Sequence, residues 1–154
     1  MSGETTKRTL ARKRLAAISA RQRVYERELE REIYDAAVVR GLTQRQISEL
    51  VGNCSQATIQ RILRRFATDP TQLDVQPAEI IDQRTAGIIT TEQMMEQLLD
   101  WKFSRGEVAR INSVATDAYS TGDWDSIENA FYRGQLTDSE FQRLADRQLH
   151  AGNP

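Results

Sequence analysis

The longest helical signal in the chain lies near its N-terminus, where no glycine or proline occurs between Glu4 and Arg40. This stretch is rich in Ala, Arg, Glu, Leu and Gln, which are strong helix formers, and in its second half the apolar residues recur on one helical face. Between Glu26 and Glu32 the charges are spaced for i,i+3 and i,i+4 ion pairs. We therefore predict one long helix from about Thr9 to residue 40, whose first turns are poor in apolar residues and are expected to fray without a partner.

Three glycine-to-threonine segments divide the rest of the chain into shorter helices. They are Gly41-Leu42-Thr43, Gly87-Ile88-Ile89-Thr90 and Gly134-Gln135-Leu136-Thr137. In each segment the glycine fits the end of one helix and the threonine fits the N-cap of the next, with a Gln or Glu three residues later to complete a capping box. We interpret the repetition as general helix-connection chemistry rather than as a true repeat. Helices are expected over residues 44–51, 56–66, 77–86, 91–103, 124–132 and 138–149, with Asp123 as the N-cap of the helix over 124–132, and an ordered loop over 104–122.

Charge is divided unevenly along the chain. Residues 1–70 carry 14 Lys and Arg against 8 Asp and Glu, a net charge of +6. Residues 71–154 carry 7 Lys and Arg against 14 Asp and Glu, a net charge of −7. A basic segment suits a polyanionic partner and an acidic one does not, so the division predicts two modules with different roles.

Residues 42–65 combine a short helix, a glycine-containing turn and a second helix that begins with small and amide side chains and continues with arginines. Such an arrangement lets the first helix cross the DNA backbone while the second helix places its N-terminal residues at base edges in the major groove. The segment resembles the helix-turn-helix of bacterial transcriptional regulators. The resemblance implies sequence-specific binding to double-stranded DNA.

Two sets of side chains are expected to contact the duplex. The base-reading set is Ser55, Gln56, Ala57, Gln60 and Arg61, since glutamine pairs with adenine, arginine prefers guanine and an alanine methyl can touch the methyl of thymine. The phosphate-binding set is Thr43, Gln44, Arg45, Arg64 and Arg65, joined by Arg12, Lys13 and Arg14 from the basic N-terminal segment. Phosphate contacts position a protein on DNA without reading its sequence.

Two positions depart from the usual helix-turn-helix pattern. The turn Gly52-Asn53-Cys54-Ser55 is one residue longer than the usual Gly-x-Ser turn, and Ser48 stands where the first helix usually has alanine. The longer turn is expected to tilt the second helix relative to the first.

No strand pattern is convincing, so the predicted fold class is all-α. We expect a basic N-terminal arm or helix extension at residues 1–20, a tri-helical helix-turn-helix domain at 21–69, a linker at 70–76 and a small acidic helical domain at 77–150. The apolar residues expected to face the core of the tri-helical domain are Ile47, Leu50, Val51, Ile59, Ile62, Leu63 and Phe66.

The acidic half holds most of the aromatic residues, namely Trp101, Phe103, Tyr119, Trp124, Phe131, Tyr132 and Phe141. This density favours a small aromatic core, and an exposed patch for a protein partner or for self-association is the alternative. Residues 86–99 and 133–145 loosely resemble the short helical pairs of SHOCT-type segments. That resemblance implies interaction or oligomerisation.

The chain has one cysteine, Cys54, and one histidine, His150. An internal disulfide is therefore impossible, and a His/Cys metal site or a Ser-His-Asp triad is not expected. No glycine-rich phosphate loop is present, so we expect no enzyme activity, no metal and no cofactor. No apolar run approaches the ~18 residues of a membrane span, and the basic N-terminus lacks the apolar segment of a secretory signal. We expect a bacterial cytoplasmic protein that does not contact membranes.

Together these features predict a DNA-binding transcriptional regulator, and specifically a repressor, that acts as a homodimer on two half-sites. Its acidic half, residues 77–150, would dimerise it or bind a protein partner. A second hypothesis is an antitoxin or another partner-neutralising protein, whose acidic half binds a specific protein and whose DNA binding is autoregulatory. A third is a structural or adaptor protein whose basic half binds protein or RNA.

Overall fold

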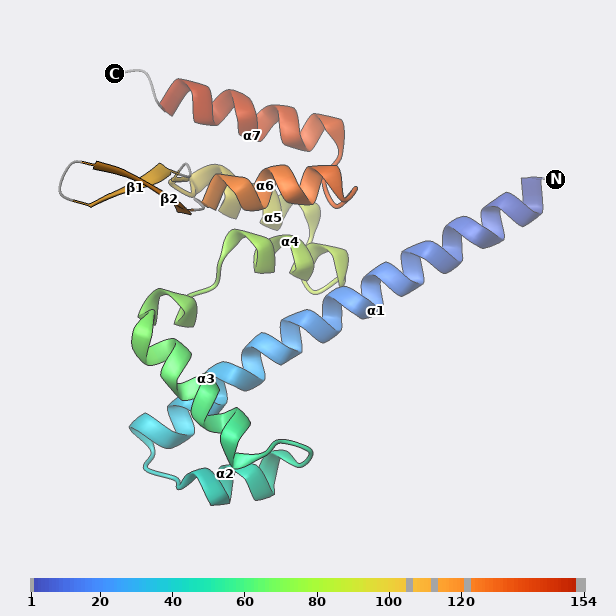
Figure 1. The fold of residues 1–154 in the computed structure, drawn as a ribbon. Coiled ribbons are helices and arrows are strands. Elements are labelled where there is room, and N and C mark those ends of the chain that lie inside the picture. Colours follow the sequence, from blue (N-terminus) through green and yellow to red (C-terminus); the bar gives the residue numbers. More distant parts are fainter. Residues whose placement is uncertain (1, 105–106, 112–113, 121–122, 152–154) are drawn as a thin grey trace. The chain divides into compact units, whose positions relative to one another are not determined.

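The computed structural model describes residues 2–104, 107–111, 114–120 and 123–151, with side chains for 3–104 and 123–150. Its helices are α1 (Ser2–Tyr34), α2 (Gln44–Val51), α3 (Gln56–Thr68), α4 (Pro77–Thr85), α5 (Thr91–Asp100), α6 (Asp123–Tyr132) and α7 (Asp138–Ala151) (Figure 1). A short 3-10 helix, Pro70–Leu73, lies in the expected linker. The all-α fold class predicted from the sequence is confirmed.

The N-terminal helix is longer than predicted at one end and changes geometry at the other. α1 begins at Ser2 rather than near Thr9, and after Tyr34 the chain continues as a wider π-helical turn, Asp35–Val39. The backbone N–H of Leu42 donates to the carbonyl of Ala36 at 2.9 Å, which closes this helix end. Gly41 lies between, with φ +76°, a conformation that glycine adopts without steric cost.

The three predicted capping boxes are present. Thr43 with Gln46 and Thr90 with Gln93 exchange side-chain and backbone hydrogen bonds at the starts of α2 and α5. At the start of α7, the Thr137 hydroxyl accepts from the backbone N–H of Glu140 at 3.1 Å, and the Glu140 carboxylate accepts from the backbone N–H of Thr137 at 2.9 Å. Each helix start therefore has its free N–H groups partly satisfied by local side chains.

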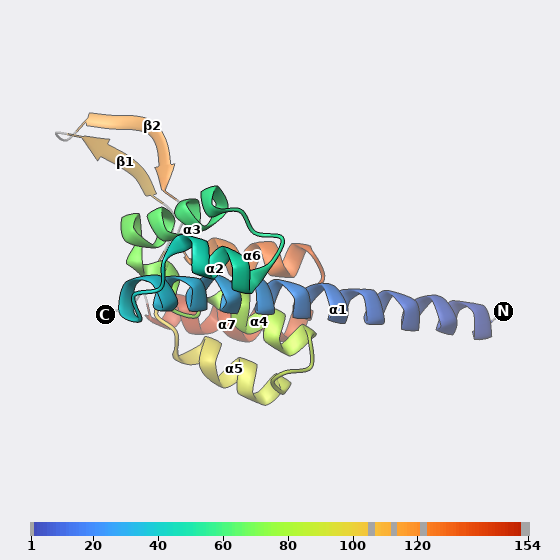
Figure 2. The ribbon, with the colours of Figure 1, turned by 90° about the horizontal axis from the view of Figure 1, so that it is seen from below.

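The expected ordered loop at 104–122 contains a β-hairpin, which corrects the sequence analysis. Strands β1 (Glu107–Ile111) and β2 (Val114–Ser120) pair antiparallel and lie side by side in Figures 1 and 2. The register pairs Glu107 with Ser120 and Ile111 with Val114, and it shifts between Val108 and Arg110. Both segments contain β-branched residues, which favour strands, and their weak apolar alternation is the signal that the sequence analysis missed.

The chain folds as two compact units, one formed by residues 22–75 and the other by residues 1–21 together with 76–154. The core of the 22–75 unit consists of Ile33, Ile47, Ile59, Ile62 and Phe66. Val51 and Leu63 pack at its edge as expected. Leu50 does not, since 76 % of its surface is exposed. The prediction for Leu50 is wrong because α2 packs against α3 and the π-helical turn along only part of its apolar face.

The second unit arranges its short helices in a ring of contacts, in which α4 and α7 each pack against both α5 and α6. Its core includes Ile80, Ile81, Met94, Met95, Leu98, Trp124, Ile127 and Leu144. Phe131 and Phe141 stack at the edge of this core with ring centroids 4.3 Å apart. The aromatic residues therefore serve mainly as core, although Tyr132 is exposed. The side chain of Tyr119 lies outside the described residues.

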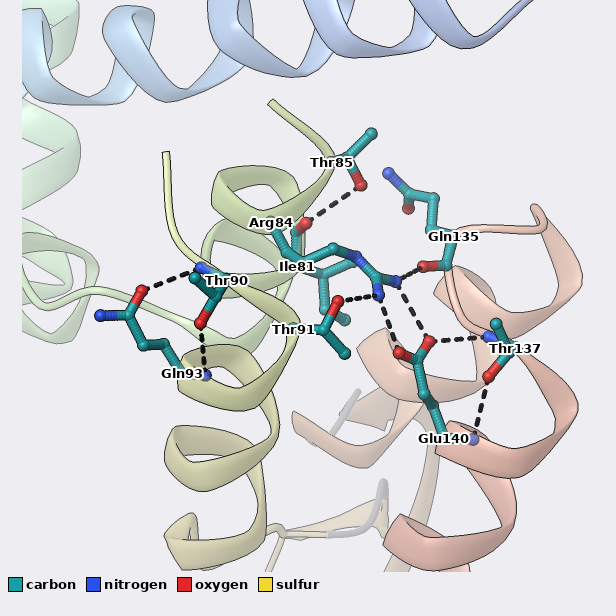
Figure 3. A network of polar contacts seen from close by, with 9 residues as sticks. All are labelled: Ile81, Arg84, Thr85, Thr90, Thr91, Gln93, Gln135, Thr137 and Glu140. Atoms are coloured by element: carbon teal, nitrogen blue, oxygen red, sulfur yellow. Dashed lines mark hydrogen bonds and ion pairs between the residues drawn. The ribbon is translucent and has the colours of Figure 1, made fainter. Parts of the chain in front are cut away.

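A largely buried ion pair joins α4 to α7 in this unit (Figure 3). The Arg84 guanidinium donates to both carboxylate oxygens of Glu140, at 2.8 and 3.2 Å, and to the carbonyl of Gln135 at 2.5 Å. Burial raises the pKa of Glu140, but hydrogen bonds from Arg84 and the Thr137 backbone, with the positive charge of Arg84, hold this pKa below its ordinary value. The capping carboxylate of α7 is therefore also a tertiary contact.

Candidate nucleic-acid interface

The α2–turn–α3 segment is organised by its own side chains. Ser55 is the N-cap of α3, and its hydroxyl accepts from the backbone N–H of Thr58 at 3.1 Å. The same hydroxyl lies 3.0 Å from the hydroxyl of Thr58. Ser55 was assigned to base reading from the sequence, and in the structure its hydroxyl is already engaged in capping the helix that carries the other candidate residues.

The turn between α2 and α3 contains two consecutive residues in the left-handed region, Gly52 with φ 67° and Asn53 with φ 45°. Glycine and asparagine are the residue types that tolerate this conformation best. The hydroxyl of Ser48, on α2, donates to the carbonyl of Cys54 at the far side of the turn. The longer turn is thus closed onto α2 by a side chain.

One face of α3 is exposed over its first turns. The exposed residues on it include Gln56, Ala57, Gln60, Arg61 and Arg64. Among the residues that the structure describes, the side chains of Gln56, Gln60 and Arg64 form no hydrogen bond or ion pair with the rest of the chain. Arg61 donates to the hydroxyl of Thr58 at 3.0 Å, which leaves most of its donors free. The arrangement offers amide and guanidinium donors on a convex helical surface.

Arg65 differs from the other arginines of α3 because it is held against α1. Its guanidinium forms an ion pair with the carboxylate of Glu30 and lies over the ring of Phe66, 5.0 Å from the ring centroid. The side chains of Arg65 and Glu30 are 43 % and 24 % exposed. Arg65 was predicted to bind phosphate, and its partner Glu30 was not predicted, since these residues are 35 positions apart.

The start of α2 presents the remaining candidates of this unit. The Thr43 hydroxyl caps α2 by accepting from the backbone N–H of Gln46 at 3.1 Å. Gln44 is partly exposed and begins the helix. Arg45 is 79 % exposed and lies 3.2 Å from the carboxylate of Glu49, which is also exposed, so solvent weakens this pair.

The three basic residues assigned to the N-terminal arm, Arg12, Lys13 and Arg14, are exposed on α1. They belong to the compact unit that contains residues 1–21, whereas all the other candidates lie in the 22–75 unit. The structure therefore brings the α2 and α3 candidates together in one unit and places the arm residues in the other.

Membrane-spanning helices and metal-binding clusters are both absent from the described part of the chain. No described helix has both the length and the apolar composition required to span a membrane. No cluster of three or more His, Cys, Asp or Glu side chains suited to a metal ion occurs among those residues.

Comparison of the chain with protein-family models, with curated proteins and with solved structures found no match. The helix-turn-helix resemblance of residues 42–65 therefore stays a prediction.

Proposed function

We propose that the chain binds double-stranded DNA through α3 and acts as a sequence-specific transcriptional repressor. The observation that supports this proposal most directly is the exposed row on α3, formed by Gln56, Ala57, Gln60, Arg61 and Arg64. Its side chains have the chemistry that reads bases and binds phosphates, and the opposite face of the same helix is buried in the core. A rigid helix thus carries the reading groups.

The charge of α3 is consistent with a polyanionic partner. The helix contains three arginines and no acidic residue. Its only arginine with a carboxylate partner among the described residues is Arg65. Arg64 is free to contact a phosphate, and Arg61 lies one turn closer to the N-terminus, where recognition helices contact base edges.

In the proposed complex, the start of α2 faces the DNA backbone. Thr43, Gln44 and Arg45 would contact phosphates there, and Arg12, Lys13 and Arg14 would add sequence-independent affinity. The acidic half would be repelled by the duplex and would be left available for a protein partner. One such module buries too little surface for high specificity, so the protein is proposed to act as a dimer on paired half-sites.

The experiment that tests this function is selection of bound sequences from a random duplex library with the full-length protein. Enrichment of one shared motif, lost in a Gln60→Ala/Arg61→Ala double variant that remains helical by circular dichroism, is the expected result. Absence of any enriched motif with the unaltered protein would overturn sequence-specific DNA binding.

A further inference from the structure

α1 is a single helix from Ser2 to Tyr34, and it carries an apolar stripe that is exposed among the described residues. The large apolar side chains of this stripe are Leu15, Ile18, Tyr25 and Leu29, which are 70, 63, 55 and 45 % exposed. With Gln22 between them, they follow one another at alternating steps of three and four residues. This is the spacing of a two-stranded coiled-coil seam.

The stripe is separate from the face that α1 buries within its own chain. Ala20 and Val24 are completely buried. At about 100° of rotation per residue, they lie on the side of the helix opposite to the stripe. Among the described residues, α1 therefore has one buried and one exposed apolar face. A row of four large exposed apolar side chains on one helix marks an interaction surface rather than scattered surface residues.

Charge along α1 indicates what covers the stripe. Residues 7–21 contain six Lys and Arg and no acidic residue, whereas residues 26–35 contain five Asp and Glu and two Arg. A second copy of α1 in parallel orientation would place the two basic stretches together. A second copy in antiparallel orientation places each basic stretch beside an acidic one.

We propose that the chain forms a homodimer in which the α1 stripes of two copies pack as an antiparallel helix pair. In the register that places Ile18 against Leu29 of the second copy, Gln22 packs against its Tyr25 and Leu15 lies opposite its Glu32. The flanking residues are then complementary, because Arg21 lies beside Glu28 of the second copy. Gln22 is the polar member of the seam, a residue type that sets register at a cost in stability.

The antiparallel pair also has a consequence for DNA binding, and this step rests on the proposed function. The seam is centred between Gln22 and Tyr25, so about ten residues of α1 separate its centre from Tyr34. At a helical rise of about 1.5 Å per residue, the two Tyr34 ends are about 32 Å apart along the axis of the helix pair. That separation is close to one turn of B-DNA, which is about 34–36 Å. A parallel pair would place both ends at the same level.

Sedimentation equilibrium of the full-length protein without DNA tests the dimer. The unaltered chain is expected at twice its 17.6 kDa mass, and Ile18→Glu is expected at 17.6 kDa. Ile88→Glu is the matched control, because Ile88 is also an exposed isoleucine but lies between α4 and α5. Tyr25→Glu is a second seam variant, and circular dichroism verifies that each variant is folded. A monomeric unaltered protein, or folded seam variants that remain dimeric, would overturn the proposal.

Single cysteines test the orientation in a Cys54→Ser background. Tyr25→Cys lies near the centre of the seam and is expected to form a disulfide-linked dimer on mild oxidation, whereas Leu15→Cys is expected to stay unlinked. Linkage through Leu15→Cys would show a parallel pair and overturn the antiparallel arrangement. Neither measurement involves DNA, so their failure is distinguishable from failure of the proposed DNA binding.

Discussion

The hydroxyl of Ser48 donates a hydrogen bond of 2.5 Å to the backbone carbonyl of Cys54. This contact connects the two positions at which the segment departs from the usual helix-turn-helix pattern. The extra residue of the turn presents a carbonyl toward α2, and serine in place of alanine supplies its donor. The two departures compensate each other, because a partly buried carbonyl without a partner costs free energy.

Replacing Ser48 by alanine is expected to lower the free energy of unfolding of the 22–75 unit by about 1–2 kcal/mol. Urea unfolding followed by far-ultraviolet circular dichroism measures this change. Ser139→Ala is the control, because Ser139 is exposed on α7. Equal unfolding midpoints for the two variants would show that the Ser48 hydrogen bond contributes nothing to stability.

The residues of α3 proposed to read bases and those proposed to bind phosphates are expected to respond differently to substitution. Gln60→Ala should reduce the preference for the selected sequence over random DNA by about tenfold, because it removes hydrogen bonds to a base edge. Arg64→Ala should weaken binding to all sequences and make the slope of log K against log salt shallower by about 0.9. Fluorescence anisotropy on specific and random duplexes measures both. Equal losses on the two duplexes for Gln60→Ala would contradict its assignment.

Removing the carboxylate of Glu30 is expected to release Arg65 toward phosphates. Glu30→Gln should raise the affinity for random DNA several-fold and make the salt slope steeper by about 0.9, as for one added phosphate contact. Glu26→Gln is the control, since it removes the same charge from an exposed position on α1. If the two variants bind alike, the gain comes from overall charge and Arg65 has no separate role.

The buried pair of Arg84 and Glu140 is expected to stabilise the unit that contains residues 76–154. Glu140→Gln removes one charge and leaves the partly buried Arg84 guanidinium without its counter-ion, so it should lower the free energy of unfolding by about 1–3 kcal/mol. Trp101 and Trp124 both belong to this unit, and their fluorescence therefore follows its unfolding in urea. Glu92→Gln, at an exposed position of α5, is the control and is expected to unfold like the unaltered protein.

The same carboxylate predicts a pH dependence of stability. The pKa of Glu140 is lower in the folded protein than its ordinary value, so the folded state holds the ionised form more strongly than the unfolded state does. Its contribution is complete above the unfolded pKa of about 4.3 and is lost as the pH falls through the folded pKa. The difference in unfolding free energy between the unaltered protein and Glu140→Gln should be constant above about pH 5 and shrink below it. A difference independent of pH down to acid unfolding would contradict this linkage.

Local signals in the sequence were sufficient for most helix boundaries. The predicted span of α2 agrees with the structure at both ends, and α6 ends at the predicted residue but begins at Asp123, which was expected to be its N-cap. Ser55 lies at the N-cap of α3, directly before the helix. These features depend on residues within one turn of each other, so they can be inferred without knowing the rest of the fold. Hydrophobic periodicity likewise identified the core residues Ile47, Ile59 and Phe66.

Features that depend on distant neighbours were not predicted. The exposure of Leu50 depends on how much of α2 is covered by other helices, and the β1–β2 hairpin depends on the pairing of two weak strands. The partner of Arg65 could not be inferred, because the sequence contains many carboxylates with which a surface arginine could pair. Only the packing of α3 against α1 selects Glu30. The candidate site was therefore predicted as a set of residues, without knowledge of which side chains are already engaged.

The sequence by itself determined where most of the shorter helices begin and which side of α3 is apolar, because capping and helical periodicity act over a few residues. Only the tertiary structure decided which polar groups are free. It paired Arg65 with Glu30, joined Arg84 to Glu140 and left Gln56, Gln60 and Arg64 exposed. The physical reason is that ion pairs and burial depend on distances of a few ångströms between residues far apart in the chain, and those distances exist only after the helices have packed.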